Sequence, residues 1–149
     1  MISKQKIHLH YLQLLENKIH ALQQKLAELK EMGANETKST AGDKYETALA
    51  MIQIEQENTR LQLRELLEQK TALEKIDTSL QTKHISTGSL VKTNHGWLYL
   101  SVALGKQTID GITITALSPQ SPLGKKLLML KVNDTAAVNN NHFTVEEIL

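Results

Sequence analysis

Apolar residues recur three and four positions apart over two long stretches, roughly residues 5–32 and 43–76, with turn-forming residues between them. In the first stretch this spacing continues without a break through Leu12, Leu15, Ile19, Leu22, Leu26 and Leu29. Such a stripe keeps one side of a helix against a partner helix. The second stretch, folded back antiparallel, is the nearest partner, so the pattern predicts a helical hairpin.

The second stretch keeps the spacing less cleanly. Its apolar positions are Tyr45, Leu49, Ile52, Leu63, Leu66, Leu73 and Ile76, and the polar Gln56, Thr59 and Lys70 fall on the same stripe. Polar seam residues fix register and partner choice at some cost in stability. A parallel dimeric coiled coil is the alternative, but the turn-rich Gly33–Gly42 stretch is unfavourable for the continuous helix it needs. At about 1.5 Å per residue each helix extends roughly 40 Å, so a tip near residues 33–44 has considerable reach.

After Asp77 the apolar period falls to two, which is typical of strands. Strands are predicted at Ser89–Thr93, Gly96–Leu104, Gly111–Ala116, Thr135–Val138 and Phe143–Ile148. One helix is predicted over Pro122–Leu130, because Ser121 is a natural N-cap and Pro122 suits the first helical position. The fold class is therefore predicted as α+β: an antiparallel helical hairpin over residues 1–77 and a small antiparallel sheet with one helix over residues 78–149.

Composition excludes several kinds of function. Residues 1–78 carry 11 Lys and Arg against 12 Asp and Glu, and residues 79–149 carry 6 against 4, so neither half concentrates the charge of a free nucleic-acid binder. The absence of cysteine excludes disulfides, thiol nucleophiles and cysteine-based zinc sites. The sequence begins in a polar amphipathic stretch and has no run of transmembrane length. We expect a soluble cytoplasmic protein that does not bind membranes.

A few isolated residues invite chemical interpretations. His8 and His10 are two positions apart on the first helix and point to different sides, so solvated or seam-edge histidines are expected there, with no metal pair. The stretch Gly105–Thr108 lacks the upstream glycine of a phosphate loop, so a hairpin turn is predicted. Trp97 and Tyr99 share one strand face, which either a second small core or a docking patch would explain.

Three segments of the second half carry a specific resemblance. They are Ser118–Leu128 (SPQSPLGKKLL), Lys131–Asp134 (KVND) and Phe143–Ile148 (FTVEEI). Together they resemble the C-terminal FKBP-like domain of the GreA/GreB family of transcription elongation factors, and the preceding hairpin is similar to that family's N-terminal coiled coil in order and rough length. The resemblance implies that the C-terminal domain docks on RNA polymerase and that the coiled coil enters the secondary channel, which brings its tip toward the catalytic magnesium.

The resemblance also implies a set of contact residues. The residues expected to bind the polymerase are Lys38, Lys44, Ser121, Pro122, Gly124, Lys125 and Lys126, and Lys131 offers a further cation. No cofactor of its own is expected, and the resemblance implies at most Mg²⁺ that the tip shares with the polymerase active site. Prolyl isomerase activity does not follow from the fold, because an aromatic-lined pocket needs more aromatics than this domain holds.

Acidic residues at the tip decide what the factor does, because a second catalytic metal needs oxygen ligands. Cleavage-competent members of the family carry an Asp-x-x-Glu-Asn-Ala-Glu-Tyr pattern there. With that pattern anchored on Tyr45, Lys38 and Ala41 stand where its two key acids would be. Asp43 and Glu46 have the same spacing, with Glu36 across the loop, but Asp43 as helix N-cap with Glu46 as its capping-box acid is the favoured structural interpretation, and the two roles are compatible.

The prediction is therefore a non-enzymatic, monomeric factor that binds RNA polymerase and modulates elongation or pausing, without sequence-specific contacts to nucleic acid. A transcript-cleavage factor that uses Asp43 and Glu46 is the alternative within the family. A coiled-coil oligomerisation protein unrelated to transcription is the alternative from another class.

Overall fold

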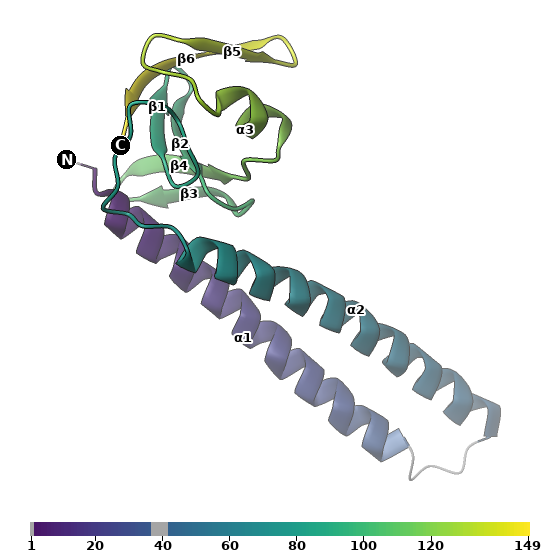
Figure 1. Ribbon diagram of the computed structural model, residues 1–149. Coiled ribbons are helices and arrows are strands. Elements are labelled where there is room, and N and C mark those ends of the chain that lie inside the picture. The colour runs from purple at the N-terminus through teal and green to yellow at the C-terminus, as the bar shows by residue number, and fades with distance from the viewer. Residues whose placement is uncertain (1, 37–41) are drawn as a thin grey trace. The chain divides into compact units, whose positions relative to one another are not determined.

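The computed structural model describes residues 2–36 and 42–149, and it describes side chains outside residues 36–45. The elements are α1 Lys4–Glu36, α2 Gly42–Glu74, β1 Leu90–Thr93, β2 Gly96–Leu100, β3 Gly105–Ile109, β4 Ile112–Leu117, α3 Pro122–Leu127, β5 Thr135–Val138 and β6 Asn141–Ile148 (Figure 1). The fold is α+β as predicted, with two long helices ahead of a six-stranded sheet and a short helix.

The chain divides into two compact units. The hairpin unit is Leu14–Lys70, and the sheet unit combines Met1–Gln13 with Thr71–Leu149. The boundary after residue 77 remains a prediction about domains, but the first turns of α1 pack with the sheet unit.

The hairpin unit is built on the predicted seam. Leu15, Ile19 and Leu29 of α1 and Ile52 of α2 are buried. An ion pair of 2.6 Å joins Lys25 to Glu55, residues late in α1 and early in α2, and another of 4.0 Å joins Glu16 to Lys70, so the helices run antiparallel (Figure 1).

One polar seam position is also buried. The Thr59 side chain is fully buried, and its hydroxyl donates to the carbonyl oxygen of Glu55 at 2.7 Å. The hydroxyl is therefore satisfied within its own helix and makes no bond that would specify the partner.

The helix ends differ from the sequence prediction. Helix α1 continues through Gly33 to Glu36. A β-carbon at Gly33 would lie 3.8 Å from Ile52, an ordinary contact, so packing against α2 does not require glycine at this position, and the prediction of a helix break there was wrong. Helix α2 begins at Gly42, so the backbone places Asp43 inside the first helical turn. The prediction of Asp43 as the N-cap of this helix was therefore wrong.

The sheet has the strand order β3-β4-β2-β1-β6-β5. Its pairs are antiparallel as predicted, except that β2 and β4 are parallel, with Tyr99 opposite Ala116. The prediction of one strand through Leu104 was wrong, because β2 ends at Leu100 and Gly105–Ile109 forms β3 where a turn was predicted. Strand β3 then pairs back on β4 and brings it alongside β2 in the same direction.

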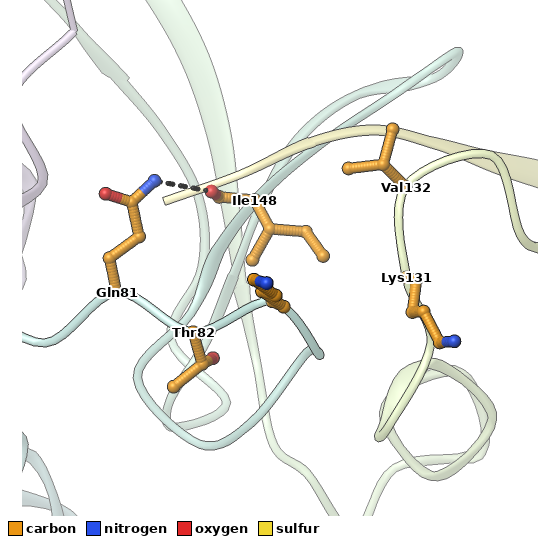
Figure 2. Close-up of a pocket in the computed structure, with 6 residues that line it drawn as sticks. Gln81, Thr82, Lys131, Val132 and Ile148 are labelled. Atoms are coloured by element: carbon orange, nitrogen blue, oxygen red, sulfur yellow. Dashed lines mark hydrogen bonds between the residues drawn. The ribbon is translucent and has the colours of Figure 1, made fainter.

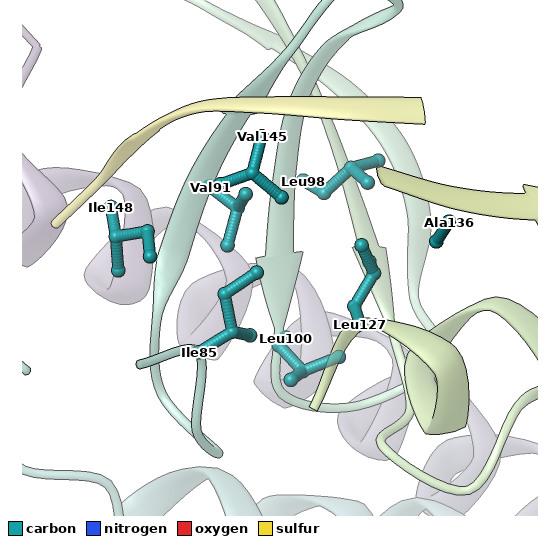
Figure 3. Close-up of a cluster of buried hydrophobic side chains, with 8 residues drawn as sticks. All are labelled: Ile85, Val91, Leu98, Leu100, Leu127, Ala136, Val145 and Ile148. Atoms are coloured by element: carbon teal, nitrogen blue, oxygen red, sulfur yellow. The ribbon is translucent and has the colours of Figure 1, made fainter. Parts of the chain in front are cut away.

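One face of the sheet carries the main core (Figure 3). The core consists of Ile85, Val91, Leu98, Leu100, Leu127, Ala136, Val145 and Ile148. Helix α3 contributes Leu127 and ends there, three residues earlier than predicted. It stops because Met129 donates its N–H to Ile85 and Leu130 accepts from the Ile85 N–H, both at 2.8 Å, so this backbone pairs with the segment before β1.

A second small core forms around Tyr99, which confirms one of the two alternatives for that residue. Tyr99 and the α1 residues Ile7 and Tyr11 are buried, and the Tyr11 hydroxyl lies 2.9 Å from the carbonyl oxygens of both Gly105 and Ile114. Burial raises the pKa of Tyr11 to about 12. The start of α1 is thus tied to β3 and β4 by a phenol that stays protonated.

The prediction of a solvated or seam-edge histidine was wrong for His8. His8 is buried, and its Nδ1 lies 2.7 Å from the Tyr99 hydroxyl. His10 Nε2 lies 3.1 Å from the side-chain oxygen of Gln107. Burial, and after it the charge of Lys4, lowers the pKa of His8, so the imidazole is held in its neutral form.

Candidate functional site

The Ser118–Gly124 turn leads into α3 and contains the residues that carry the family resemblance. Ser121 caps the helix: its Oγ accepts from the Gly124 N–H at 3.0 Å and donates to the Ser118 carbonyl at 2.7 Å. Pro122 occupies the first helical position, as predicted, and is exposed. The three bonded residues form a closed turn that presents Pro122 on the surface.

Gly124 has no room for a side chain. A β-carbon there would lie 2.1 Å from the Ser118 carbonyl oxygen and 2.9 Å from Ser121 Oγ, both too close for real atoms. The glycine is therefore required by the close approach of two backbone segments, and the turn cannot keep this shape with any other residue.

The lysines of this region differ in their surroundings. Lys125 is exposed on α3. The Lys126 ammonium donates to the carbonyl oxygen of Ala137, so it also ties α3 to the edge strand β5. Of the predicted contact residues on α3, Lys125 is thus a solvent-facing cation, whereas Lys126 has a structural bond as well.

An open pocket of about 510 Å³ lies close to the end of β6 (Figure 2). It is lined by Gln81, Thr82, Lys83, Lys131, Val132 and Ile148. Gln81 donates to the Ile148 carbonyl at 3.1 Å and so fixes one wall. The ammonium groups of Lys83 and Lys131 have no ion-pair partner within the described chain, and both flank the apolar Val132 and Ile148.

This pocket fits an apolar side chain flanked by carboxylates. Lys131 was predicted only as a further cation on the surface, and the 81–83 wall was not predicted. Its polar residues lie in a segment without periodicity, and only the fold brings them beside residues 131–132.

The tip candidates are only partly described. Lys38 lies outside the described residues. Glu36 is the last residue of α1, and Asp43 and Lys44 lie in the first turn of α2. The structure describes the backbone of these three residues but not their side chains. Glu46 is exposed on α2, three positions after Asp43. The backbone thus places Asp43 and Glu46 on the same side of one helical turn.

The described residues form neither a metal-binding cluster nor a helix suited to a membrane. No group of three or more His, Asp or Glu side chains there is arranged to hold a metal ion. None of the helices in that part of the chain has both the length and the apolar character needed to cross a bilayer.

Comparison with known proteins gives similarity at the level of structure but not of sequence family. No protein-family model matches the sequence, and no curated protein matches it. Among solved structures, the chain is similar to the structure of the transcription factor Gfh1, with 18% sequence identity, coverage of 92% of each chain and a TM-score of 0.36. Similarity at this level does not by itself establish a shared function.

Proposed function

We propose that this protein is a transcription factor that binds RNA polymerase with its sheet unit and modulates the polymerase active centre with the closed end of its hairpin, inserted through the secondary channel. The proposal rests on the sequence resemblance to the GreA/GreB family. The observation that carries it is the interlocked Ser118–Ser121–Gly124 turn, because the residues of the resembling motif are those that hold the turn together.

The sheet unit offers a surface suited to anchoring. Lys125 on α3 and the unpaired Lys83 and Lys131 at the pocket present positive charge, and Pro122 and Val132 are exposed apolar residues close to these lysines in sequence. Cations around an apolar contact favour an acidic partner surface and speed association by electrostatic attraction. An acidic, partly apolar surface on the polymerase is the partner that this chemistry fits.

The hairpin unit is suited to reaching a confined site. From Leu14 to Glu36, α1 runs about 35 Å at the usual rise of an α-helix. Leu15, Ile19 and Leu29 of its seam are buried and Leu22 and Leu26 between them are half-buried, so the paired helices form a narrow rod. A rod of this length can bring the residues at its closed end to an active centre that a globular domain cannot enter.

Binding to purified bacterial core RNA polymerase tests the proposal. The protein has no cysteine, so a single Lys18→Cys substitution on the exposed side of α1 gives a unique site for a fluorescent label. Fluorescence anisotropy should show saturable binding, and Lys125→Glu should weaken it. Lys106→Glu is the matched control, because Lys106 is also exposed but lies on β3.

A second variant separates binding to the polymerase from the change in polymerase activity. Replacing residues 33–42 by a short Gly-Ser turn should leave binding intact and abolish any change in pausing or elongation. No binding by the intact protein, together with a dimeric mass in light scattering, would favour the coiled-coil oligomerisation alternative.

Stimulated transcript cleavage is a second candidate, favoured by the position of Asp43 and Glu46 on one turn of α2. Carboxylates so placed would help a polymerase-bound Mg²⁺ position a water for attack on the RNA. The double substitution of Asp43 and Glu46 by Ala should then abolish RNA cleavage by a backtracked polymerase without changing binding. Unchanged cleavage excludes these acids from that role.

A further inference from the structure

Helix α2 carries an apolar stripe that the hairpin does not use. Met51 is 66% exposed, Ile54 62% and Leu61 45%, whereas Ile52 between them is buried in the seam. Isolated exposed apolar residues are ordinary, but a row of them on one helix face is typical of an interaction surface.

The row has the spacing of a helix-packing surface. Its positions are Met51, Ile54, Asn58, Leu61, Glu65 and Glu68, which alternate three and four apart. Ile54 and Leu61 each follow a buried seam residue, Ile52 and Thr59, by two positions, or about 200° around the helix. The outer stripe therefore lies on the side of α2 opposite its seam with α1.

A second copy of this chain is a poor occupant. In a parallel pair, Glu65 and Glu68 would each face the same acid of the other copy, and in an antiparallel pair centred on Asn58, Met51 would face Glu65. Only three of the six positions are apolar, whereas a self-supporting coiled coil needs three to four apolar heptads. The stripe thus requires a partner with a different sequence.

The acidic residues of the stripe indicate the chemistry of the partner surface. Glu65 and Glu68 are exposed and have no ion pair among the described residues, and they continue the stripe beyond Leu61. A complementary surface has an apolar row followed by Lys or Arg side chains that face the two acids.

We infer that the outer stripe of α2 is a docking face for a basic-flanked apolar surface of RNA polymerase, so that the hairpin is held along its side while the sheet unit anchors the protein. This inference rests on the proposed function. It makes the side of the hairpin a determinant of affinity, in addition to the sheet unit.

The test uses the labelled full-length protein and purified core RNA polymerase. The double substitution Met51→Gln/Ile54→Gln keeps helix-forming side chains of similar length, so hairpin melting followed by circular dichroism should be unchanged. Its Kd should rise by about tenfold or more. Met32→Gln, at a residue 50% exposed on α1, is the matched control and should bind like the wild type.

A charge reversal provides the second arm. Glu65→Lys/Glu68→Lys should weaken binding at low salt and lose part of this effect at high salt, because exposed charge pairs are screened. Wild-type binding with an unchanged Kd in both double variants would overturn the docking face alone. Absence of wild-type binding would overturn the proposed function itself, and a wild-type dimer abolished by Met51→Gln/Ile54→Gln in sedimentation velocity would reassign the stripe to self-association.

Discussion

Replacing Gly124 by alanine sets helix propensity against packing. Gly124 lies inside α3, where alanine is intrinsically favoured over glycine by about 1 kcal/mol. The new β-carbon, however, would lie 2.1 Å from the Ser118 carbonyl oxygen, which must move by about 1 Å to reach the closest separation that real atoms show.

The magnitude follows from what that movement breaks. Ser118 accepts from Ser121 Oγ, which in turn accepts from the Gly124 N–H, so displacing the turn disturbs the helix cap. Loss of a cap costs about 1 kcal/mol and overpacking about 1–3 kcal/mol, against the gain of about 1 kcal/mol in helix propensity. A net loss of about 1–3 kcal/mol lowers the melting temperature of a unit of this size by roughly 5–20 °C.

Thermal melting followed by the fluorescence of Trp97 measures this effect in the sheet unit, because Trp97 is the only tryptophan and lies in β2. Ser121→Ala is the control for the cap alone and should cost about 1 kcal/mol. Lys125→Ala, at an exposed position of the same helix, should be close to neutral. A Gly124→Ala protein that melts at or above the wild-type temperature would refute the steric argument.

Three further substitutions or conditions test the buried polar groups. Tyr99→Phe leaves the buried His8 imidazole without its 2.7 Å partner and should cost about 1–3 kcal/mol in urea denaturation. Burial and the charge of Lys4 lower the pKa of His8 in the folded protein, so the contribution of neutral His8 to stability is fully present above the unfolded pKa near 6.5 and is lost as pH falls. The wild type should therefore melt at a lower temperature at pH 5 than at pH 8. The substitution His8→Gln should reduce that difference. A wild-type melting temperature that rises toward pH 5, with His8→Gln unchanged in this respect, would contradict the assignment. Thr59→Val should leave hairpin stability, measured by circular dichroism, unchanged or raised by up to about 1 kcal/mol, because the hydroxyl bonds only to the Glu55 carbonyl of its own helix; a loss above about 2 kcal/mol would show that the hydroxyl has a further role.

The periodic segments were predicted well because the spacing of their apolar residues shows directly which side of the helix is buried. The alternation of three and four through Leu15, Ile19 and Leu29 identified the buried side of α1, and all three are buried. The cap at Ser121 followed from local chemistry in the same way, since its bonds reach only to residues three positions away.

The failures concern residues whose partners are distant in sequence. The Gly105–Ile109 strand has little apolar alternation, and pairing with Ile112–Leu117 is what makes it a strand. His8 looked like a solvated histidine on a polar helix, but Tyr99, 91 residues later, forms the bond that accompanies its burial. The 81–83 wall of the pocket gave no signal for the same reason.

The sequence by itself determined the two long helices, their shared seam, the cap of α3 and the motif on which the functional proposal rests. These features depend on interactions between residues a few positions apart, or on a repeated pattern, which a single sequence displays directly. Only the tertiary structure decided the parallel pairing of β2 with β4, the burial of His8 against Tyr99, the lysines at the pocket and the solvent exposure of the Met51–Leu61 stripe. Each of these depends on which distant segments pack together, and the free energy of that packing comes from the whole fold and cannot be assigned to any local stretch.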